Sequence, residues 1–357
     1  MSLAARTPRS PGEPVKDSAP SNPVVAPPTG SGSEADELSA VASLAARLKA
    51  LGARPAVQPT TIAPAPGALL AVHASAALLA LGLGWTWPLL GLGLLGTVGL
   101  SAAREAEGRH GWLRDWVPRR VGHNVAIWTA ATPEGRAPRL LVVAPLDAGA
   151  GRAPVGSGVL IGLGATGALG ALGIALAPFA PQAGSILLGG AASVLALAAL
   201  GGLLHAQLRS WRAGSGPADA QLEALVAALS DQPTHHVEVV LAWISGGARC
   251  GDGLVTLLRN NPHRLPPERT RALVLEAGAL GPALVNVEGR WQRRPVDPLI
   301  ARAAAEVGLP VVDGITPARR AMDAGWTAAA LLVRDGADTA LPRLVRQLDQ
   351  AAGEGRW

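Results

Sequence analysis

The sequence contains a single cysteine, Cys250, which excludes a disulfide framework and any zinc or iron–sulfur site built from several cysteines. Charged residues make up only 16% of its 357 residues, well below the roughly 25% of an ordinary soluble protein. Tyrosine is absent and phenylalanine occurs once, whereas alanine, glycine, leucine and arginine dominate. This composition argues against a purely soluble single domain.

The chain also lacks a basic block, although its formal net charge is +5. The arginines of residues 1–54, 103–153 and 206–357 are accompanied by aspartate and glutamate in each of these segments. Nucleic-acid binding needs a clustered basic surface for phosphate contacts, and the sequence provides none. We therefore expect no nucleic-acid partner.

The N-terminal part of the chain divides into a tail, a helix and a linker. Residues 1–33 are rich in proline, serine and glycine and have too few apolar residues for a core, so we expect a disordered tail. The spacing of Leu38, Val41, Leu44 and Leu48 predicts an amphipathic helix from residue 34 to 51. We expect residues 34–66 to comprise this helix and a linker.

Two long stretches, residues 55–103 and 153–208, contain no aspartate, glutamate, lysine or arginine. Each can hold two transmembrane helices of about 20 apolar residues, and each is interrupted near its middle by proline. Trp85 and Trp87 at the first interruption suit the membrane–water boundary, which indole rings favour. The alternative is two buried hairpins of a soluble protein. We expect four transmembrane helices in two hairpins, at residues 67–103 and 155–205, with spans near 67–84, 87–103, 155–177 and 183–205.

The distribution of arginine predicts the orientation of these hairpins. Their tips carry no lysine or arginine, whereas Arg54, Arg104 and Arg209 lie close to the opposite ends of the spans. The positive-inside rule then places the polar segments on the cytoplasmic side of the inner membrane. Because each hairpin returns the chain to the same side, residues 104–154 and 206–357 can form one cytoplasmic domain.

Apolar runs and helical periodicities alternate within this domain and predict an α/β fold. Strands are expected at residues 123–129, 139–144, 236–244, 271–275, 284–287 and 328–333, with a short one at 311–312. Several are almost wholly apolar, as expected of strands covered on both faces. Helices are expected at residues 218–230, 252–260, 298–307, 316–324 and 339–352.

The order of these segments resembles the M28 family of zinc aminopeptidases over roughly residues 120–160 and 236–350. The resemblance implies a three-layer α/β domain with a mixed sheet, assembled from residues 104–154 and 206–357. The motifs that carry it are Asn124-Val followed by a strand leading to Asp147, Ser157-Gly-Val, the strand 239–244 with the loop 246–251, the strand ending at Glu276, and Ala337-Asp-Thr. In the family these positions carry Asn-Val with His-x-Asp, Ala-Ser-Gly-Val, Gly-x-Glu-Glu-x-Gly, an acidic ligand, and His-Thr-Pro-x-Asp-Thr.

Most of the family's metal-site residues are missing from this sequence. The resemblance places Pro145 at the first histidine, Ala248 and Arg249 at the glutamate pair, Thr316-Pro317 at a serine–aspartate pair, and Arg334 at the last histidine. Only Asp147 and Glu276 remain of the acidic set. A pair of zinc ions needs histidine and carboxylate ligands around both ions and a glutamate to activate water. We therefore expect no zinc, no other cofactor and no peptidase activity.

The remnant of the metal pocket is expected to be a binding site made of Asp147, Arg249, Glu276 and Arg334. Carboxylates left together without a metal would repel one another, and a guanidinium can supply the missing positive charge through two hydrogen bonds. An open alternative is that both arginines point into solvent.

Together these features predict a membrane-anchored, M28-like protein without catalytic activity. Such a protein would act as a scaffold, a partner-binding module or a ligand sensor, with the lipid bilayer and an unidentified protein or peptide as partners. The first alternative is an active zinc aminopeptidase whose ligands lie at other positions. A transporter component is a second alternative, but no charged residue within the spans marks a substrate path.

Overall fold

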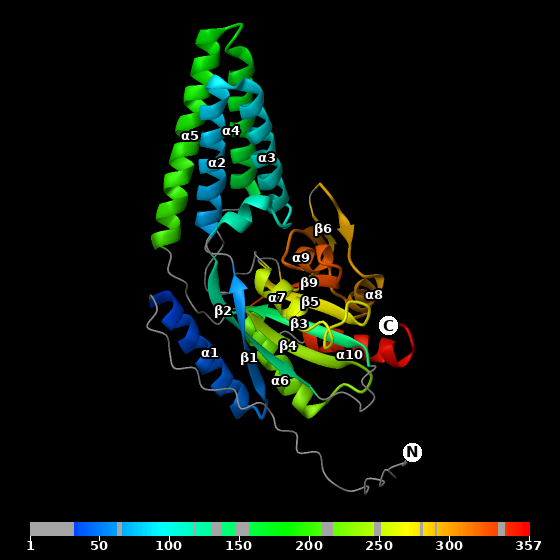
Figure 1. Cartoon of the computed structure of the whole chain (residues 1–357). Helices are drawn as coiled ribbons and strands as arrows, with labels where there is room; N and C mark the ends of the chain where they lie inside the picture. Colours follow the sequence, from blue (N-terminus) through cyan, green and yellow to red (C-terminus); the bar gives the residue numbers. More distant parts are fainter. Residues whose placement is uncertain are drawn as a thin grey trace, which may run out of the picture.

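The computed structural model describes residues 32–62, 66–117, 119–129, 137–146, 157–208, 217–245, 251–278, 281–289, 291–334 and 340–357. These residues form an α/β domain and a bundle of long helices that projects from it (Figure 1). The bundle is made of two helical hairpins inserted between elements of the α/β domain. The tail expected over residues 1–33 lies almost wholly outside the described residues.

Nine strands of the described residues form one mixed sheet in the order β1-β2-β4-β3-β5-β9-β6-β7, with β8 paired to β6. The central strands β4, β3, β5 and β9 are parallel, whereas β2 is antiparallel to β1 and β4, and β6 is antiparallel to β9. The strands are β1 (Pro55–Ile62), β2 (Arg120–Trp128), β3 (Arg139–Pro145), β4 (Glu238–Ile244), β5 (Thr270–Ala277), β6 (Ala283–Glu288), β7 (Arg294–Pro295), β8 (Val311–Gly314) and β9 (Thr327–Val333).

Helices cover both faces of this sheet, which explains why its central strands are apolar throughout. On one face, α6 packs against β3, β4 and β5 and lies between α1 and α10. On the other face, α7 contacts β1 and β2, and α9 contacts β5 and β9. These helices are α1 (Gly32–Ala50), α6 (Pro217–Asp231), α7 (Asp252–Asn260), α8 (Pro298–Glu306), α9 (Ala318–Asp323) and α10 (Ala340–Gly353).

Local sequence signals account for the ends and the buried faces of these helices. Asp297 caps α8, because its side chain accepts hydrogen bonds from the amides of Leu299 and Ile300, and Pro298 follows at the first helical position. In α10 the buried residues recur at helical spacing, as with Leu341, Leu344, Val345 and Leu348.

Each expected strand and helix of the α/β domain is present, with ends that differ by a few residues. Two strands were not predicted. The segment expected to be a linker contains β1, which pairs along its whole length with β2. Pro55 and Pro59 argue against a strand in the sequence. Proline is tolerated here because β1 lies at the edge of the sheet. The two-residue strand β7 is too short to give a sequence signal.

The bundle contains α2 (Pro66–Thr86), α3 (Pro88–Ala106), α4 (Ser157–Leu176) and α5 (Pro181–Leu208). Helix α2 packs against α3 and α5, and α4 packs against the same two helices. Small residues lie where the helices cross. A Cβ atom on Gly91 would clash with the backbone of Gly84, and one on Gly202 would clash with the backbone of Gly67. Helices in membranes pack closely through small residues of this kind.

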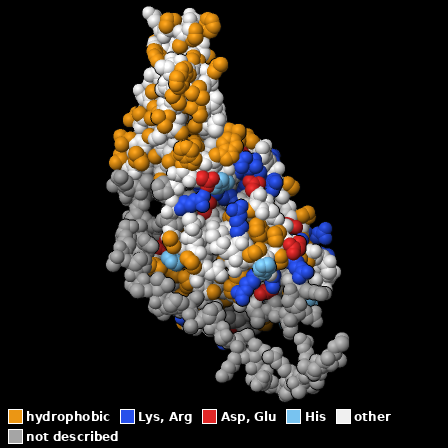
Figure 2. Space-filling model, in the orientation of Figure 1, with side chains coloured by type: hydrophobic (Ala, Val, Ile, Leu, Met, Phe, Trp, Pro, Cys, Tyr) orange, Lys and Arg blue, Asp and Glu red, His pale blue; other side chains and the backbone are white. Residues whose placement is uncertain are grey.

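The outer surface of the bundle is apolar. Large side chains such as Leu79, Leu89, Leu169, Ile186 and Leu197 are exposed on it. On the face shown in Figure 2, acidic and basic side chains lie on the α/β domain, and the projecting part of the bundle shows almost none. Monomeric soluble proteins rarely expose apolar surface of this extent.

Three of the described helices are long and apolar enough to cross a membrane, as judged by length and composition. They cover Gly67–Thr86, Val159–Leu176 and Pro181–Leu204. We expected four membrane-spanning helices, and three of the described helices meet these criteria. Helix α3 is absent from this group because Arg104 and Glu105 occupy its last turns and several glycines lower its hydropathy.

The bundle adjoins the edge of the sheet at which the parallel strands end. β1 leads toward α2, and the short 3₁₀ helix η1 (Trp112–Trp116) connects α3 to the start of β2. Because β2 is antiparallel to both β1 and β4, the carboxyl ends of β3 and β4 lie at this same edge. Open α/β sheets place their ligand sites at the carboxyl ends of strands, so this edge is where a site is expected.

Candidate functional site at the foot of the helix bundle

The structure describes two of the four residues predicted for the remnant metal pocket. Glu276 lies near the end of β5, opposite Leu332 of β9, and Arg334 follows the last residue of β9 and is exposed. The parallel pairing therefore brings these two residues to the ends of neighbouring strands. Asp147 and Arg249 lie outside the described residues, so the predicted contacts among the four remain a prediction.

The described residues at this edge do not fit the pair of zinc ions that the resemblance implies. Pro145, at the position of the first histidine, is buried, is paired with Ile244 and has no ligand atom. Within the described ranges, no group of three or more histidine, cysteine, aspartate or glutamate residues is placed to hold a metal ion. The polar interactions that distinguish this edge are made by other side chains.

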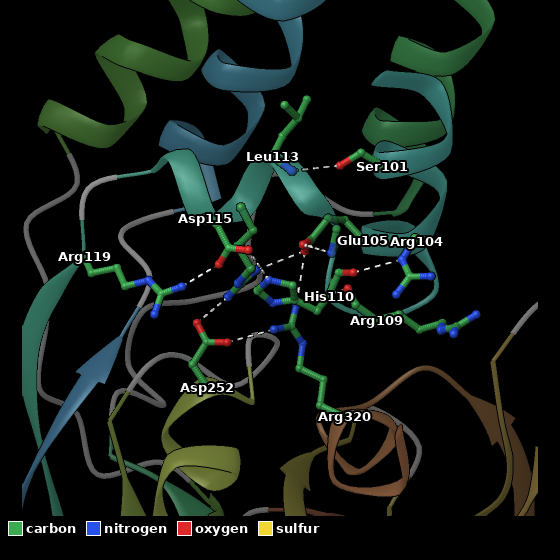
Figure 3. Close-up of polar contacts among 12 residues, drawn as sticks. Ser101, Arg104, Glu105, Arg109, His110, Leu113, Asp115, Arg119, Asp252 and Arg320 are labelled. Atoms are coloured by element: carbon green, nitrogen blue, oxygen red, sulfur yellow. Dashed lines mark hydrogen bonds and ion pairs between the residues drawn. The ribbon is translucent and has the colours of Figure 1, made fainter. Parts of the chain in front are cut away.

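The most distinctive arrangement at this edge is a closed ring of ion pairs, which we call the ion-pair ring (Figure 3). Arg114 of η1 contacts Glu105 of α3 at 3.0 Å and Asp252 of α7 at 2.6 Å. Arg320 of α9 contacts the same two carboxylates, at 3.2 Å for Glu105 and 2.8 Å for Asp252. Two members come from the foot of the bundle and two from the α/β domain, so the ring joins the two parts.

The ion-pair ring is largely removed from water. The side chains of Glu105, Arg114 and Arg320 are 3%, 4% and 6% exposed, and that of Asp252 is 17% exposed. Burying an ion costs several kcal/mol unless it is paired with good geometry. Here every guanidinium meets two carboxylates and every carboxylate meets two guanidinium groups, so the four formal charges cancel. The ring thus holds its members in position but is poorly suited to proton transfer.

A second set of hydrogen bonds joins β2 to Ser245, the residue after β4, and to Gly253 of α7. Asn124 of β2 accepts a hydrogen bond from the amide of Ser245 at 3.1 Å and donates to the carbonyl of Gly253 at 3.1 Å. Ser245 also donates from its hydroxyl to Glu37 of α1 at 2.6 Å. Asn124 belongs to the Asn-Val pattern found in the sequence, and in the structure its side chain joins Ser245 to Gly253.

A buried carboxylate, that of Glu288 at the end of β6, lies against the start of α9. Glu288 accepts hydrogen bonds from the amide and the hydroxyl of Thr316, and Arg319 donates to its backbone carbonyl at 2.9 Å. Burial raises the pKa of Glu288 to about 7, although the hydrogen bonds from Thr316 and the charge of Arg319 oppose this rise. Glu288 therefore titrates near neutral pH.

Sequence reasoning did not find the ion-pair ring. Arg114 and Asp252 are 138 positions apart, and Glu105 and Arg320 are 215 positions apart, so no local spacing connects them. The one available signal was the presence of charged residues immediately after a predicted span. By itself, such a signal indicates only the orientation of the membrane helices.

Comparisons with known proteins leave the family open. No protein-family model matches the chain, and no curated protein matches it. The geometry of this edge is therefore the basis for a functional assignment.

Proposed function

We propose that this protein is an integral membrane protein whose α/β domain is a non-catalytic, M28-like binding module fixed at the membrane surface. The domain would bind a protein, peptide or small ligand at the carboxyl edge of its sheet. The observation that carries the proposal is the ion-pair ring. Its ion pairs connect the carboxyl edge of the sheet to the foot of the bundle. A binding event at the edge would thereby be held close to the bilayer.

The construction of the bundle supports its insertion in a bilayer. Small residues lie at its helix crossings, and many of its leucines are exposed on its outer surface, which is the packing expected when the surroundings are hydrocarbon. Trp85, Trp87 and Phe179 are exposed at the tip, where aromatic rings favour the lipid headgroup region. We include α3 as a fourth span because it packs between α2 and α4 and returns the chain from the tip to the foot.

The charges at the two ends of the bundle support a cytoplasmic position for the α/β domain. The foot carries Arg104, Arg109, Arg114 and Arg119, whereas the turns between α2 and α3 and between α4 and α5 carry no charged residue. Arginine and lysine accumulate in the cytoplasmic loops of membrane proteins. The foot would therefore lie at the cytoplasmic surface of the inner membrane.

The residues at the carboxyl edge support binding rather than hydrolysis. A buried proline stands where the resemblance expects a zinc-binding histidine, Ala248 and Arg249 stand where it expects the glutamate pair, and Arg334 stands where it expects the last histidine. The carboxylates of Glu105 and Asp252 in the ion-pair ring are each bound by two arginines. Water activation by these groups would require breaking the ion-pair ring.

Metal content and peptidase activity of the detergent-purified chain test this proposal. We expect no stoichiometric zinc by mass spectrometry and no release of nitroaniline from aminoacyl-nitroanilides with added zinc. Activity that a chelator abolishes, that zinc restores and that Glu276→Gln removes would establish the alternative of an active zinc aminopeptidase. Such a result would refute the non-catalytic assignment.

Capture of a partner tests the binding role. Arg334 is exposed at the carboxyl edge, and Arg302 is exposed on α8. If a stoichiometric partner co-purifies with the chain, Arg334→Glu should release it and Arg302→Glu should retain it. Equal retention by both variants would show that the partner binds at another surface.

A further inference from the structure

Helix η1 lies against the foot of the bundle and exposes both of its tryptophans. Trp112 is 46% exposed and Trp116 is 79% exposed. The amide of Leu113, between them in sequence, donates to the hydroxyl of Ser101 at 3.2 Å, which places η1 beside the last turns of α3. Helix α2 packs against η1 as well, and Figure 1 shows the chain between α3 and β2 crossing the foot of the bundle.

The position of η1 is fixed on its inner side. Arg114 is buried in the ion-pair ring, so η1 is tied to α7 as well as to α3. With Arg114 buried on the inner side of η1, the two indoles lie outside the protein core. Exposed tryptophans at the end of apolar helices favour the boundary between hydrocarbon and water, where the ring is apolar and its N–H group can be hydrated.

A cation lies next to these indoles. The guanidinium of Arg104 lies 5.5 Å from the centre of the Trp112 ring and donates to the carbonyl of His110 at 3.0 Å. Arg109 and Arg119, which are also labelled in Figure 3, are paired with Asp323 and Asp115. Arg104 has no carboxylate within ion-pair distance in the described part of the chain, so its charge is available to an outside anion.

We propose that Trp112, Trp116 and Arg104 form a membrane-interface surface that binds the headgroup region of anionic phospholipids. The indoles would lie at the level of the lipid glycerol groups, and Arg104 would bind headgroup phosphate or carboxylate oxygens. This inference rests on the proposed function, because it requires the bundle to span the bilayer.

Continuity with the apolar surface of the bundle favours lipid as the occupant. Leu100, one helical turn before Arg104 on α3, is exposed toward the surroundings of the bundle. Helix α2 has 21 residues and so is about 30 Å long, which matches the hydrocarbon core of a bilayer. Trp85 and Trp87 at its end would mark one boundary, and Trp112 and Trp116 beside the foot would mark the other.

Quenching of tryptophan fluorescence by brominated lipid tests this surface in the full chain reconstituted into phosphatidylcholine vesicles. The lipid carries bromine near the glycerol end of its acyl chains. With Trp85→Phe and Trp87→Phe as the background, we expect Trp112→Phe and Trp116→Phe together to remove most of the remaining quenching. The matched control is Trp291→Phe, because Trp291 is similarly exposed but lies on the α/β domain.

The charge of the lipid tests Arg104. Replacing part of the phosphatidylcholine by brominated phosphatidylserine should increase quenching of the Trp112 and Trp116 fluorescence at the same bromine content. Arg104→Gln should weaken the apparent affinity for phosphatidylserine about fivefold, as expected for one basic residue at an anionic surface. Arg302→Gln, at an exposed arginine of α8, should leave this affinity unchanged.

The tryptophans at the tip and those at the foot of the bundle report on different claims. Together they distinguish a failure of this inference from a failure of the proposed function. If Trp85→Phe and Trp87→Phe remove quenching from the otherwise unaltered chain but Trp112→Phe and Trp116→Phe do not, the bundle spans the membrane and the interface surface is refuted. If neither pair is quenched, the membrane-spanning bundle is refuted. Quenching of Trp112 and Trp116 that is equal in both lipids and insensitive to Arg104→Gln would refute the role of Arg104.

Discussion

Removal of Arg114 from the ion-pair ring should destabilise the protein far more than removal of a neighbouring surface arginine. Arg114→Ala leaves the carboxylates of Glu105 and Asp252 facing Arg320 alone, with one uncompensated negative charge in a largely buried site. Breaking a buried ion pair in this way costs about 3–5 kcal/mol. The corresponding fall in the folding equilibrium constant is at least about a hundredfold.

Arg119→Ala is the matched control, because Arg119 lies in the same connecting segment and pairs with Asp115 at 2.5 Å. Both partners are about half exposed, so this pair should contribute at most about 1 kcal/mol. Urea unfolding of the two variants in detergent micelles measures the difference, with the fully buried Trp243 of β4 among the fluorescent reporters. Equal losses of stability in the two variants would refute the reasoning that the ring is a buried joint.

Two further predictions concern a titrating carboxylate and a helix crossing. The pKa of Glu288 is about 7 in the folded state against an ordinary 4.5, so the folded protein retains a proton that the unfolded chain releases between these pH values. The free energy of unfolding should therefore fall by up to about 3 kcal/mol as the pH rises from 4.5 to 7, and Glu288→Gln should remove this dependence from the urea midpoint. In the bundle, Gly91→Ala should lower the melting temperature because the new Cβ atom meets the backbone of Gly84, whereas Gly93→Ala faces open space and should stabilise its helix by up to about 1 kcal/mol. A melting temperature that falls equally in both glycine variants would contradict the close crossing.

The sequence predicted those helices and strands whose pattern of apolar residues lies within a single segment. Helix α7 occupies the predicted residues 252–260, and β4 contains an unbroken apolar run over residues 239–244. β1 was missed because Pro55 and Pro59 argue against a strand, and only its place at the sheet edge makes them acceptable. Helix α3 is less apolar than the other three helices of the bundle because its last turn carries charged residues, of which Glu105 is paired with Arg114 at the foot of the bundle.

The candidate site was less accessible to sequence reasoning because its contacts join distant segments. Arg114 and Asp252 give no local pattern, and their pairing depends on how η1 and α7 meet at the foot of the bundle. The resemblance to M28 peptidases singles out Glu276 and Arg334, which lie near the ends of the neighbouring strands β5 and β9 at the carboxyl edge of the sheet. It could not reveal that buried arginines also connect this edge to the helices.

Cysteine accessibility in intact cells tests most directly the central claim that the bundle spans the membrane with the α/β domain at its cytoplasmic foot. Single cysteines at Thr86, at Gln182 and at the exposed Glu268 of the α/β domain would be introduced into a Cys250→Ser background. The account predicts that a membrane-impermeant maleimide labels the first two positions from outside and labels Glu268→Cys only after lysis. Labelling of Glu268→Cys in intact cells with protection of both tip positions would contradict the orientation, and recovery of the chain without detergent would contradict the membrane bundle itself.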